Sequence, residues 1–405
     1  MNNKNIVLIT SGQPSLNPRL VKEADSLTQQ GFDVKVIYQY WSEYATKLDH
    51  ELLADKKWSA ILVGGTPSIN KLYYWISRIR HKSYAFVSQY FSMKYGFAEN
   101  TIARTNKLLL KEALKINADL YIAHNLGALP VAVNAAKANK TKCGFDAEDF
   151  HRNEISDDVN SFDVRLKKYI EDEYLKEIDY FTAASPLIAN AYRELYPQLN
   201  PVVINNVFEI RNQPKINTNK NNVLKLFWFS QTVGRNRGLE DIIGALNVIN
   251  NSLIQLHFLG ALSPESQHYF NNLATFEIQY YTPIEADEIF DFASKFDIGL
   301  ALEPGFCFNN KIALSNKIFT YLISGLAILA SNTAAQQDFL QENKNIGELY
   351  QIGNTKALAD IITKLFNNRE QLNEYKRNTF NLAQSKYNWE LEQNKFLKIV
   401  NEVIA

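Results

Sequence analysis

The sequence predicts an α/β protein built from two Rossmann-like, doubly wound domains that face a cleft. Three observations support this prediction. Short apolar segments alternate with amphipathic helical segments along the chain. The alternation is interrupted by a polar, asparagine-rich stretch, residues 211–222, and starts again near Lys225. The chain also has 405 residues, which is more than one ordinary hydrophobic core contains.

The first half opens with a β-α-β unit. Residues 5–10 are predicted to form a strand, and residues 18–30 a helix with Asn17 as its N-cap and Pro18 at the favoured first position. Residues 33–38 form the next strand. Such an opening is typical of a parallel sheet with right-handed crossovers. Further strands are expected at residues 61–63, 120–123, 142–146 and 180–183.

The second half repeats the pattern. A strand at residues 226–229 precedes a helix at residues 238–249, in which apolar side chains recur at positions i, i+3, i+4 and i+7. The chain ends in two helical patterns, at residues 370–386 and 389–403. Further strands are expected at residues 256–260, 278–280, 298–302 and 328–331.

The polar stretch suggests where the domains divide. We expect an N-terminal domain over residues 1–208 and a C-terminal domain over residues 209–387, with a last helix at residues 388–405 that packs back on the first domain. In doubly wound sheets, ligands bind beyond the carboxyl ends of the strands. Two such domains would therefore place a binding site in the cleft between them.

Composition and charge argue against several classes of protein. Lys+Arg and Asp+Glu number 43 each, so the net charge predicts no nucleic-acid partner. Cys143 and Cys307 form neither a zinc spacing nor a disulfide framework, which is typical of the cytoplasm. The first apolar run, residues 6–9, is too short for a signal peptide, and no run reaches the length of a membrane span. We therefore expect a cytoplasmic protein.

Several cofactor signatures are missing from the sequence. No Gly-x-Gly-x-x-Gly follows the first strand, which argues against a nicotinamide or flavin enzyme, and there is no P-loop. No Asp-x-Asp triplet and no histidine, cysteine and carboxylate cluster with metal spacing is visible. We therefore expect no cofactor and no metal ion.

Residues 297–332 carry the most informative pattern. A strand leads through a loop into a helix that opens at Ser315, Asn316 and Lys317, with Ser315 as the expected N-cap. The free N–H groups and the positive dipole end of such a helix suit a phosphate, and Lys317 adds a full positive charge. On periodicity alone, a plain β-α-β unit with a surface lysine is the simpler interpretation.

The segment SNKIFTYLISGLAILAS, residues 315–331, resembles the donor-binding segment of family-four GT-B glycosyltransferases. In that family a lysine lies near the donor diphosphate, and an acidic residue eight positions after another one holds the ribose hydroxyls. Here Thr320 stands at the acidic position and Ile312 at the earlier one. Glu303 is the nearest acidic candidate, and a solvated loop glutamate is the alternative. The matching positions are Lys317, Tyr321, Gly325, Ala330 and Ser331.

Residues 224–246 resemble the opening of the C-terminal domain in the same family, where Gly-Arg and then Lys-Gly precede a helix. Arg237 takes the lysine position. Gln231 stands where an arginine is common, and Arg235 is its candidate replacement. An arginine can clasp two phosphate oxygens, which would suit a leaving diphosphate; the alternative is an exposed helix-cap arginine. The donor-binding candidates are Gln231, Thr232, Glu303, Ser315, Asn316 and Thr320.

Three segments of the first half resemble the acceptor side of these enzymes. Residues 11–19 resemble the Asp-Pro-Arg that often follows the first strand. Residues 118–125 resemble a strand whose last histidine, here His124, faces the transferred sugar; a structural histidine is the alternative. Residues 144–154 resemble a Tyr-Asp-x-His-Glu segment, in which Asp146 would fix the loop. The acceptor-binding candidates are Gly12, Asn17, Arg19, Glu148 and His151.

The resemblance implies sugar transfer from a nucleoside diphosphate sugar to a glycan or lipid-linked acceptor, as in polysaccharide biosynthesis. It also implies a reaction that retains the anomeric configuration and needs no metal, with His124, Arg237 and Lys317 as catalytic candidates. Three alternatives stay open: a nucleotide-sugar epimerase on the same fold, an inactive homologue that serves as a binding subunit of a glycosylation complex, and a membrane scaffold.

Residues 56–98 form a basic and aromatic region without a single Asp or Glu. Basic side chains interleaved with aromatic ones suit an anionic membrane surface, so we consider peripheral contact with the inner face of a membrane. A helical pair with a solvated basic face and a dimer interface are the alternatives. The basic residues are Lys56, Lys57, Lys71, Arg78, Arg80, Lys82 and Lys94.

Overall fold

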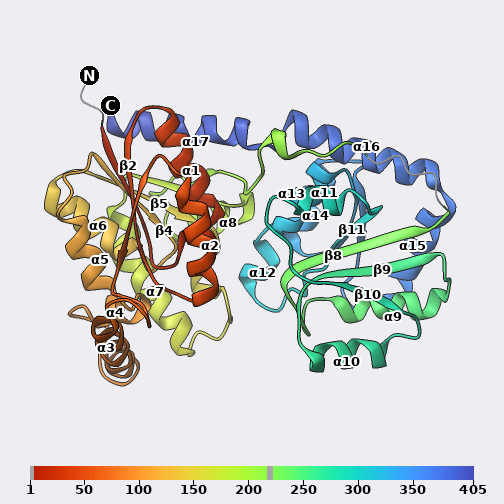
Figure 1. Ribbon diagram of the computed structural model, residues 1–405, viewed down its shortest axis with the longest axis horizontal. Helices are drawn as coiled ribbons and strands as arrows, with labels where there is room; N and C mark the ends of the chain where they lie inside the picture. The colour runs from red at the N-terminus through yellow and green to blue at the C-terminus, as the bar shows by residue number, and fades with distance from the viewer. Residues whose placement is uncertain (1–3, 217–221) are drawn as a thin grey trace. The chain divides into compact units, whose positions relative to one another are not determined.

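The computed structural model describes residues 4–216 and 222–405 (Figure 1). Of the linker expected at residues 211–222, residues 217–221 lie outside the described part. The chain divides into two compact units. The first comprises Met1–Ile204, Cys307–Asn309 and Gln393–Ala405, and the second comprises Asn205–Phe306 and Asn310–Glu392.

The first unit is built on a sheet of seven parallel strands in the order β3-β2-β1-β4-β5-β6-β7. The strand order reverses beside β1, as the doubly wound prediction requires. The strands are β1 (Asn5–Thr10), β2 (Asp33–Gln39), β3 (Ser59–Val63), β4 (Leu120–His124), β5 (Lys142–Ala147), β6 (Tyr180–Ala183) and β7 (Val202–Val203).

Helices cover this sheet, and the last helix of the chain, α17 (Trp389–Ile404), contributes most of its length to the same unit. The side chain of Asn17 accepts a hydrogen bond from the Leu20 N–H at 2.9 Å, so the predicted N-cap is confirmed. The other helices are α1 (Pro18–Gln29), α2 (Glu43–Ala54), α3 (Lys71–Tyr90), α4 (Phe97–Ile102), α5 (Asn106–Ala113), α6 (Leu129–Asn139), α7 (Phe162–Tyr174) and α8 (Pro186–Leu195).

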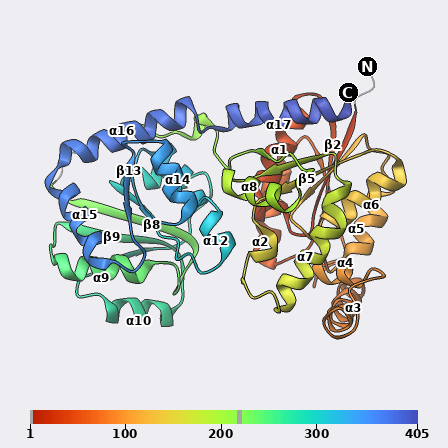
Figure 2. The same cartoon turned by 180° about the vertical axis from the view of Figure 1, so that it is seen from behind.

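The second unit contains six parallel strands in the order β10-β9-β8-β11-β12-β13. Figure 2 shows its helices from the side opposite to Figure 1. Its strands are β8 (Leu224–Val233), β9 (Ile254–Leu262), β10 (Ile278–Tyr281), β11 (Ile298–Ala301), β12 (Ala327–Ser331) and β13 (Gly347–Tyr350). Its helices are α9 (Leu239–Ile249), α10 (Pro264–Leu273), α11 (Ile289–Ala293), α13 (Asn316–Ser324), α14 (Ala334–Glu342), α15 (Thr355–Asn367) and α16 (Arg369–Ser385), and the short α12 (Phe308–Ile312) crosses the division between the units.

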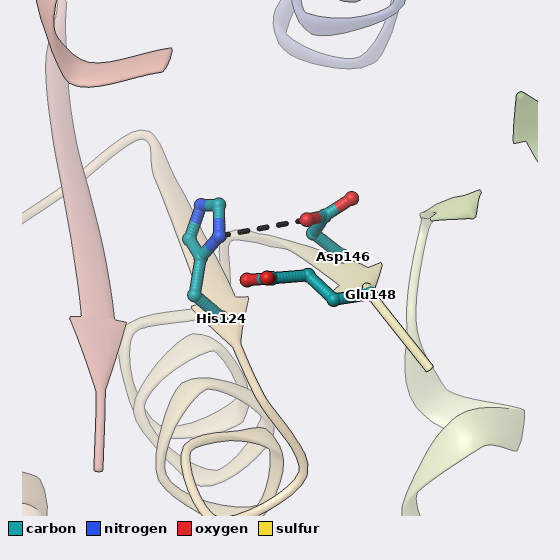
Figure 3. Close-up of side chains that lie close together, drawn as sticks. All are labelled: His124, Asp146 and Glu148. Atoms are coloured by element: carbon teal, nitrogen blue, oxygen red, sulfur yellow. Dashed lines mark ion pairs between the residues drawn. The ribbon is translucent and has the colours of Figure 1, made fainter. Parts of the chain in front are cut away.

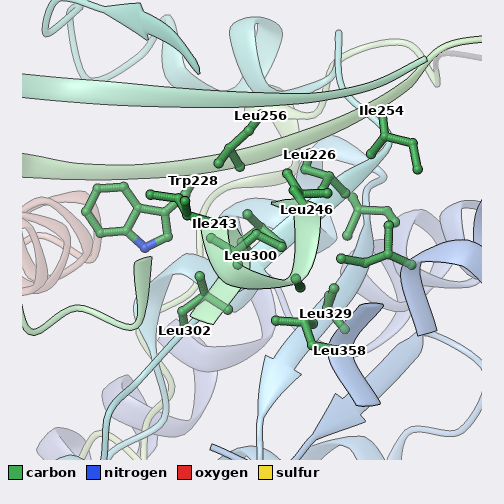
Figure 4. Packing of buried hydrophobic residues seen from close by; sticks show 14 of the residues in the cluster. Leu226, Trp228, Ile243, Leu246, Ile254, Leu256, Leu300, Leu302, Leu329 and Leu358 are labelled. Atoms are coloured by element: carbon green, nitrogen blue, oxygen red, sulfur yellow. The ribbon is translucent and has the colours of Figure 1, made fainter. Parts of the chain in front are cut away.

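The core of the second unit lies between the sheet and helices α9 and α15 (Figure 4). Leu226, Leu256 and Leu300 come from three strands that lie side by side, and all are fully buried. Ile243 of α9 and Leu358 of α15 pack into the same cluster. Because strands buried on both faces carry nearly continuous apolar runs, the parallel sheet follows directly from the sequence.

Strand β8 is longer than the sequence predicts. We expected a strand over residues 226–229, but β8 continues to Val233 and pairs with β9 up to Leu262, past an irregularity between Phe229 and Thr232. The polar residues after Phe229 lack the apolar signal of a strand, and their pairing with β9 keeps them extended. Within the described residues, we find no helix with the length and apolarity that crossing a membrane requires.

Candidate functional site

A cavity of about 330 Å³ lies in the second unit, beyond the carboxyl end of β11 and at the start of α13. This is the edge of a parallel sheet at which ligands bind. The lining includes three cations and one carboxylate. The lining residues are Trp228, Arg235, Asn236, Arg237, Leu302, Glu303, Pro304, Phe306, Asn310 and Lys317. The cavity therefore brings Arg237 and Lys317, the two phosphate-binding candidates, to one place.

A glycine allows the two halves of this lining to approach each other. Gly238 precedes α9 with a φ of +74°, and a Cβ there would lie 2.8 Å from the Cβ of Leu302, directly after β11. Any other residue would push the loop that carries Arg237 away from Leu302. The close contact between these two loops thus depends on a missing side chain.

Arg237 is held in place by two hydroxyl groups from β8. Its Nη1 donates to Ser230 Oγ at 2.9 Å, and its Nη2 donates to Thr232 Oγ1 at 3.1 Å. Arg235 lies beside it, with its guanidinium 3.9 Å from the ring centre of Tyr269. A guanidinium anchored in this way is oriented before any ligand arrives, which suits it to an anion.

Lys317 forms an ion pair with Glu303, since its Nζ lies 3.1 Å from Glu303 Oε1. Ser315 Oγ donates to the same oxygen at 2.8 Å, and Asn310 Nδ2 donates to Oε2 at 3.2 Å. Burial alone would raise the pKa of Glu303, but Lys317 and these donors outweigh it and lower the pKa below its ordinary value. Glu303 is therefore a paired carboxylate inside the site, not a solvated loop residue.

Ser315 corrects one detail of the prediction. It occupies the N-cap position of α13, as expected, but its side chain makes no hydrogen bond to the helix. Its hydroxyl bonds to Glu303 instead. The first N–H groups of α13 thus lack a side-chain cap, and a helix start of this kind is suited to binding an anion.

The remaining donor-side candidates lie outside the cavity lining. Thr320, expected near a ribose, is only 2% exposed, because α13 turns it toward the interior. Asn316 is exposed at the helix start. Gln231 and Thr232 are exposed on β8, and Thr232 supports Arg237.

The sequence interpretation missed several residues of this site. Trp228 forms part of the wall, its ring centre lies 5.6 Å from Lys317 Nζ, and its indole N–H has no hydrogen-bond partner among the described residues. Ser230 and Asn310, which hold Arg237 and Glu303, were also missed. A signal for Ser230 was available, because hydroxyl residues alternate along β8 directly before the arginine loop.

The acceptor-side candidates lie in the first unit, where the register of the sheet brings three polar residues together. Thr10 of β1 pairs with His124 of β4, and His124 pairs with Asp146 of β5. All three stand at or near the carboxyl ends of their strands and are buried. The parallel register therefore produces a polar cluster at the edge where the sequence places the acceptor.

Arg19 lies inside this cluster and is completely buried. Its Nε and Nη2 donate to the two carboxylate oxygens of Asp146 at 2.5 and 2.6 Å, and its Nη1 donates to the carbonyl of Ile204. Thr182 also donates to Asp146, at 2.5 Å. We expected Arg19 to contact an acceptor, but its guanidinium is occupied within the core, so we assign it a structural role instead.

His124 is also completely buried. Its Nε2 lies 3.1 Å from Glu23 Oε2 on α1. Figure 3 shows the second contact, in which His124 Nδ1 lies 3.6 Å from Asp146 Oδ2. Burial lowers the pKa of His124, but the two carboxylates outweigh it and raise the pKa above its ordinary value. These contacts match the structural histidine that the sequence left as the alternative to a sugar contact.

Glu148 lies next to this network and is only partly buried. Burial, with Asp146 nearby, raises its pKa to about 7. Side-chain ligand atoms of His124, Asp146 and Glu148 all lie within 4.8 Å of one another. Asp146 already accepts hydrogen bonds from Arg19 and Thr182, so the group has the chemistry of an ion-pair network rather than of a metal site.

The other acceptor-side candidates differ in how far they can be reached. Asn17 is buried as a helix cap, and His151 is buried with its Nδ1 at 3.4 Å from Glu154 Oε2. Gly12 is partly exposed after β1, and its N–H donates to Thr10 Oγ1 at 3.1 Å. Gly12 and Glu148 are therefore the acceptor candidates that solvent reaches.

Comparison with known proteins extends this picture. No protein-family model and no curated protein sequence matches the chain. Sucrose-phosphate synthase from Thermosynechococcus elongatus is similar in structure, with a TM-score of 0.74, 12% identity and 99% of each chain covered. HepE from Anabaena, solved with UDP and glucose, has a TM-score of 0.67 and 13% identity over 99% of this chain and 100% of its own.

A protein described as a UDP-N-acetylglucosamine 2-epimerase, from Listeria monocytogenes, is also similar. Its TM-score is 0.58 at 12% identity, over 98% of this chain and 95% of its own. At identities this low, such likenesses concern the fold. They confirm the predicted architecture, two Rossmann-like domains of the GT-B type.

Proposed function

We propose that this protein is a glycosyltransferase that moves a sugar from a nucleoside diphosphate sugar to a glycan or lipid-linked acceptor. The observation that carries the proposal is the shared cavity of Arg237 and Lys317. Arg235, Arg237 and Lys317 bring three positive charges to the cavity lining and Glu303 brings one negative charge, so the net charge of the lining is plus two. Outside the lining, the exposed carboxylate of Glu265 lies 3.9 Å from Arg235. A diphosphate diester carries two negative charges, so the cavity and such a ligand are electrostatically complementary.

The chemistry proposed for this cavity is stabilisation of a leaving group. When the bond between the sugar and the diphosphate breaks, negative charge builds on the diphosphate oxygens. Arg237, fixed by Ser230 and Thr232, can accept that charge without rearranging. Lys317 and the uncapped start of α13 add to the same field. We propose that this charge replaces a metal ion and that the anomeric configuration is retained.

On the acceptor side, we propose a role for Glu148. Its carboxyl follows β5, is partly exposed and has a pKa of about 7. A group with such a pKa can hold or release a proton near neutral pH, as binding and activating a hydroxyl group requires. Gly12, partly exposed after β1, is the proposed backbone contact.

A binding screen tests the donor proposal. Purified protein is melted with UDP, GDP, ADP and TDP sugars, and one nucleotide is expected to stabilise it, by about 2.7 kcal/mol when the ligand is at 100 times its Kd. Turnover is then measured with Arg237→Ala, for which we expect a loss on the order of 10²–10³-fold. Arg377→Ala is the control, because that arginine is exposed on α16 of the same unit. Unchanged turnover in Arg237→Ala would contradict the proposal.

Two other functions share this fold and have an observation in their favour. The likeness to the 2-epimerase favours a nucleotide-sugar epimerase, which would form product without any acceptor. Thr320 is buried and stands at the position where the resembled family carries an acidic residue that holds the ribose. The loss of that residue favours an inactive binding subunit. Such a subunit would not bind any sugar nucleotide in the same screen and would show no turnover.

We also propose that the protein works in the cytoplasm, in polysaccharide biosynthesis, and contacts the inner face of a membrane. The acid-free region of residues 56–98 supports this location. This region contains helix α3, whose orientation indicates which surface makes the contact.

A further inference from the structure

Helix α3 (Lys71–Tyr90) exposes its apolar side chains and buries polar ones. Its buried residues are Tyr74, Ser77 and Ser88. Leu72 is 71% exposed and Ile79 is 66% exposed. A helix that packs on a soluble core shows the opposite arrangement, so the outer face of α3 needs an explanation.

Six of the exposed apolar and aromatic residues lie on one face of α3, four in its first half and two in its second, whereas Tyr73, 62% exposed, lies beside that face. The six recur at positions i, i+3, i+4, i+7, i+14 and i+18, which fall on the same face of a helix with 3.6 residues per turn. All of them are large and exposed. The stripe consists of Leu72, Trp75, Ile76, Ile79, Phe86 and Tyr90.

Contacts on the inner face fix the rotation of α3. Arg104 Nη1 donates to Ser77 Oγ at 2.5 Å, and His81 Nε2 lies 2.8 Å from the carbonyl oxygen of Thr101. Ser88 Oγ and Thr101 Oγ1 are 2.9 Å apart. Rotation of α3 about its own axis would break these three contacts. They therefore hold the stripe toward solvent. Figure 1 shows α3 at the margin of its unit.

Positive charges flank the stripe on both sides. Lys71, Arg78 and Lys82 are spaced by seven and four residues, which places them along one edge, and Arg80 lies on the other. All four are exposed. Among the described ion pairs, no carboxylate pairs with any of them.

We infer that α3 lies flat on an anionic lipid surface, with its stripe in the headgroup region and its four cations against the phosphates. An apolar stripe between two basic edges is the arrangement of helices that lie in a membrane interface. A second copy of the chain fits less well, because it would bring the same positive edges together. The inference rests on the proposed membrane contact and specifies which surface makes it.

The test uses the full-length protein and vesicles, with no sugar substrate. We expect co-sedimentation with vesicles of phosphatidylcholine and phosphatidylglycerol, and at least tenfold weaker binding to phosphatidylcholine alone. Trp75→Ser with Ile79→Ser should reduce binding to the anionic vesicles by tenfold or more. Val248→Ser is the matched control, because Val248 is equally exposed at 66% on α9 of the other unit.

Charge is tested separately. Replacing Arg80 and Lys82 by Gln should weaken binding to the anionic vesicles about fivefold for each charge removed, the equivalent of ~1 kcal/mol each. Binding by this variant should also depend less on salt concentration. Binding that is equal on both vesicle types, or unaffected by the stripe variant, would overturn the inference. So would a dimer in sedimentation velocity that the stripe variant dissociates. Nucleotide-induced stabilisation, measured on the same variants, reports on sugar-nucleotide binding separately.

Discussion

Glu303 forms an ion pair with Lys317 inside the cavity that Arg235 and Arg237 also line, with Oε1 and Nζ 3.1 Å apart. The carboxylate is held by two further donors, Ser315 and Asn310, so it does not depend on the lysine for its place. A diphosphate that reaches Lys317 must therefore compete with a built-in carboxylate. We therefore expect the ion pair to lower the affinity of the site for simple anions, so that tight binding requires further contacts between the ligand and the protein.

We expect Glu303→Gln to bind inorganic pyrophosphate several-fold more tightly than the wild type. The substitution removes one negative charge from the lining, so the net charge there rises from two to three. Calorimetry at low and high salt measures the effect, which should shrink as ionic strength increases. Glu285→Gln, an exposed carboxylate of the same unit, is the control. Weaker pyrophosphate binding in Glu303→Gln would show that the carboxylate only orients the lysine.

Stability should depend on pH through Glu148. Its pKa is about 7 in the folded protein and 4.5 ordinarily. Between these values the folded protein keeps the proton and the unfolded chain has lost it, so stability falls as pH rises. Glu148→Gln removes this dependence. Between pH 5 and pH 8, the variant should lose about 2 kcal/mol less stability than the wild type.

Urea unfolding at the two pH values provides the measurement. Glu173→Gln, exposed on α7, is the control for loss of a carboxylate and should follow the wild type. If Glu148→Gln also follows the wild type, Glu148 titrates normally and loses its support as the acceptor-side acid–base group.

Most strands and several helix starts could be predicted from the sequence, because apolar periodicity and caps are local signals. The edge strands β7 and β13 were missed, since β7 has only two residues and β13 is only partly buried along most of its length, so neither has a strong apolar signal. The partner of Lys317 could not be predicted, since Glu303 lies fourteen positions earlier in the chain and the path of the segment between them, which includes α12, is set by tertiary contacts. The burial of His124 was equally hidden. Its strand shows that it follows an apolar run, but only the register beside Asp146 and the packing of α1 show what encloses it.

Arg19 and Asp146 should be among the most sensitive positions for folding. In Asp146→Asn, the Arg19 guanidinium would stay buried without its counter-ion, and we expect a loss of about 3–5 kcal/mol of stability. The double variant Arg19→Met, Asp146→Asn removes both charges and should be more stable than Asp146→Asn alone. Denaturant unfolding of the two variants decides this, and a double variant less stable than the single one would contradict it.

Gly238 allows the loop that carries Arg237 to pack against Leu302, and Gly234 in the same loop offers a matched control. Gly238 has a φ of +74°, and a Cβ there would meet Leu302 Cβ at 2.8 Å and Leu302 O at 3.1 Å. At Gly234 a Cβ would meet nothing within 4 Å. The same substitution, glycine to alanine, is therefore strained at one position and free at the other.

Gly238→Ala should lose about 1–3 kcal/mol of stability and bind the donor nucleotide about tenfold more weakly, whereas Gly234→Ala should resemble the wild type. The binding loss follows because relief of the clash moves the backbone next to Arg237, whose anchors Ser230 and Thr232 stay on β8. Thermal melting and nucleotide titration separate the two effects. If Gly238→Ala is destabilised but binds normally, Arg237 is positioned by its β8 hydroxyls alone and the close approach to Leu302 serves only folding.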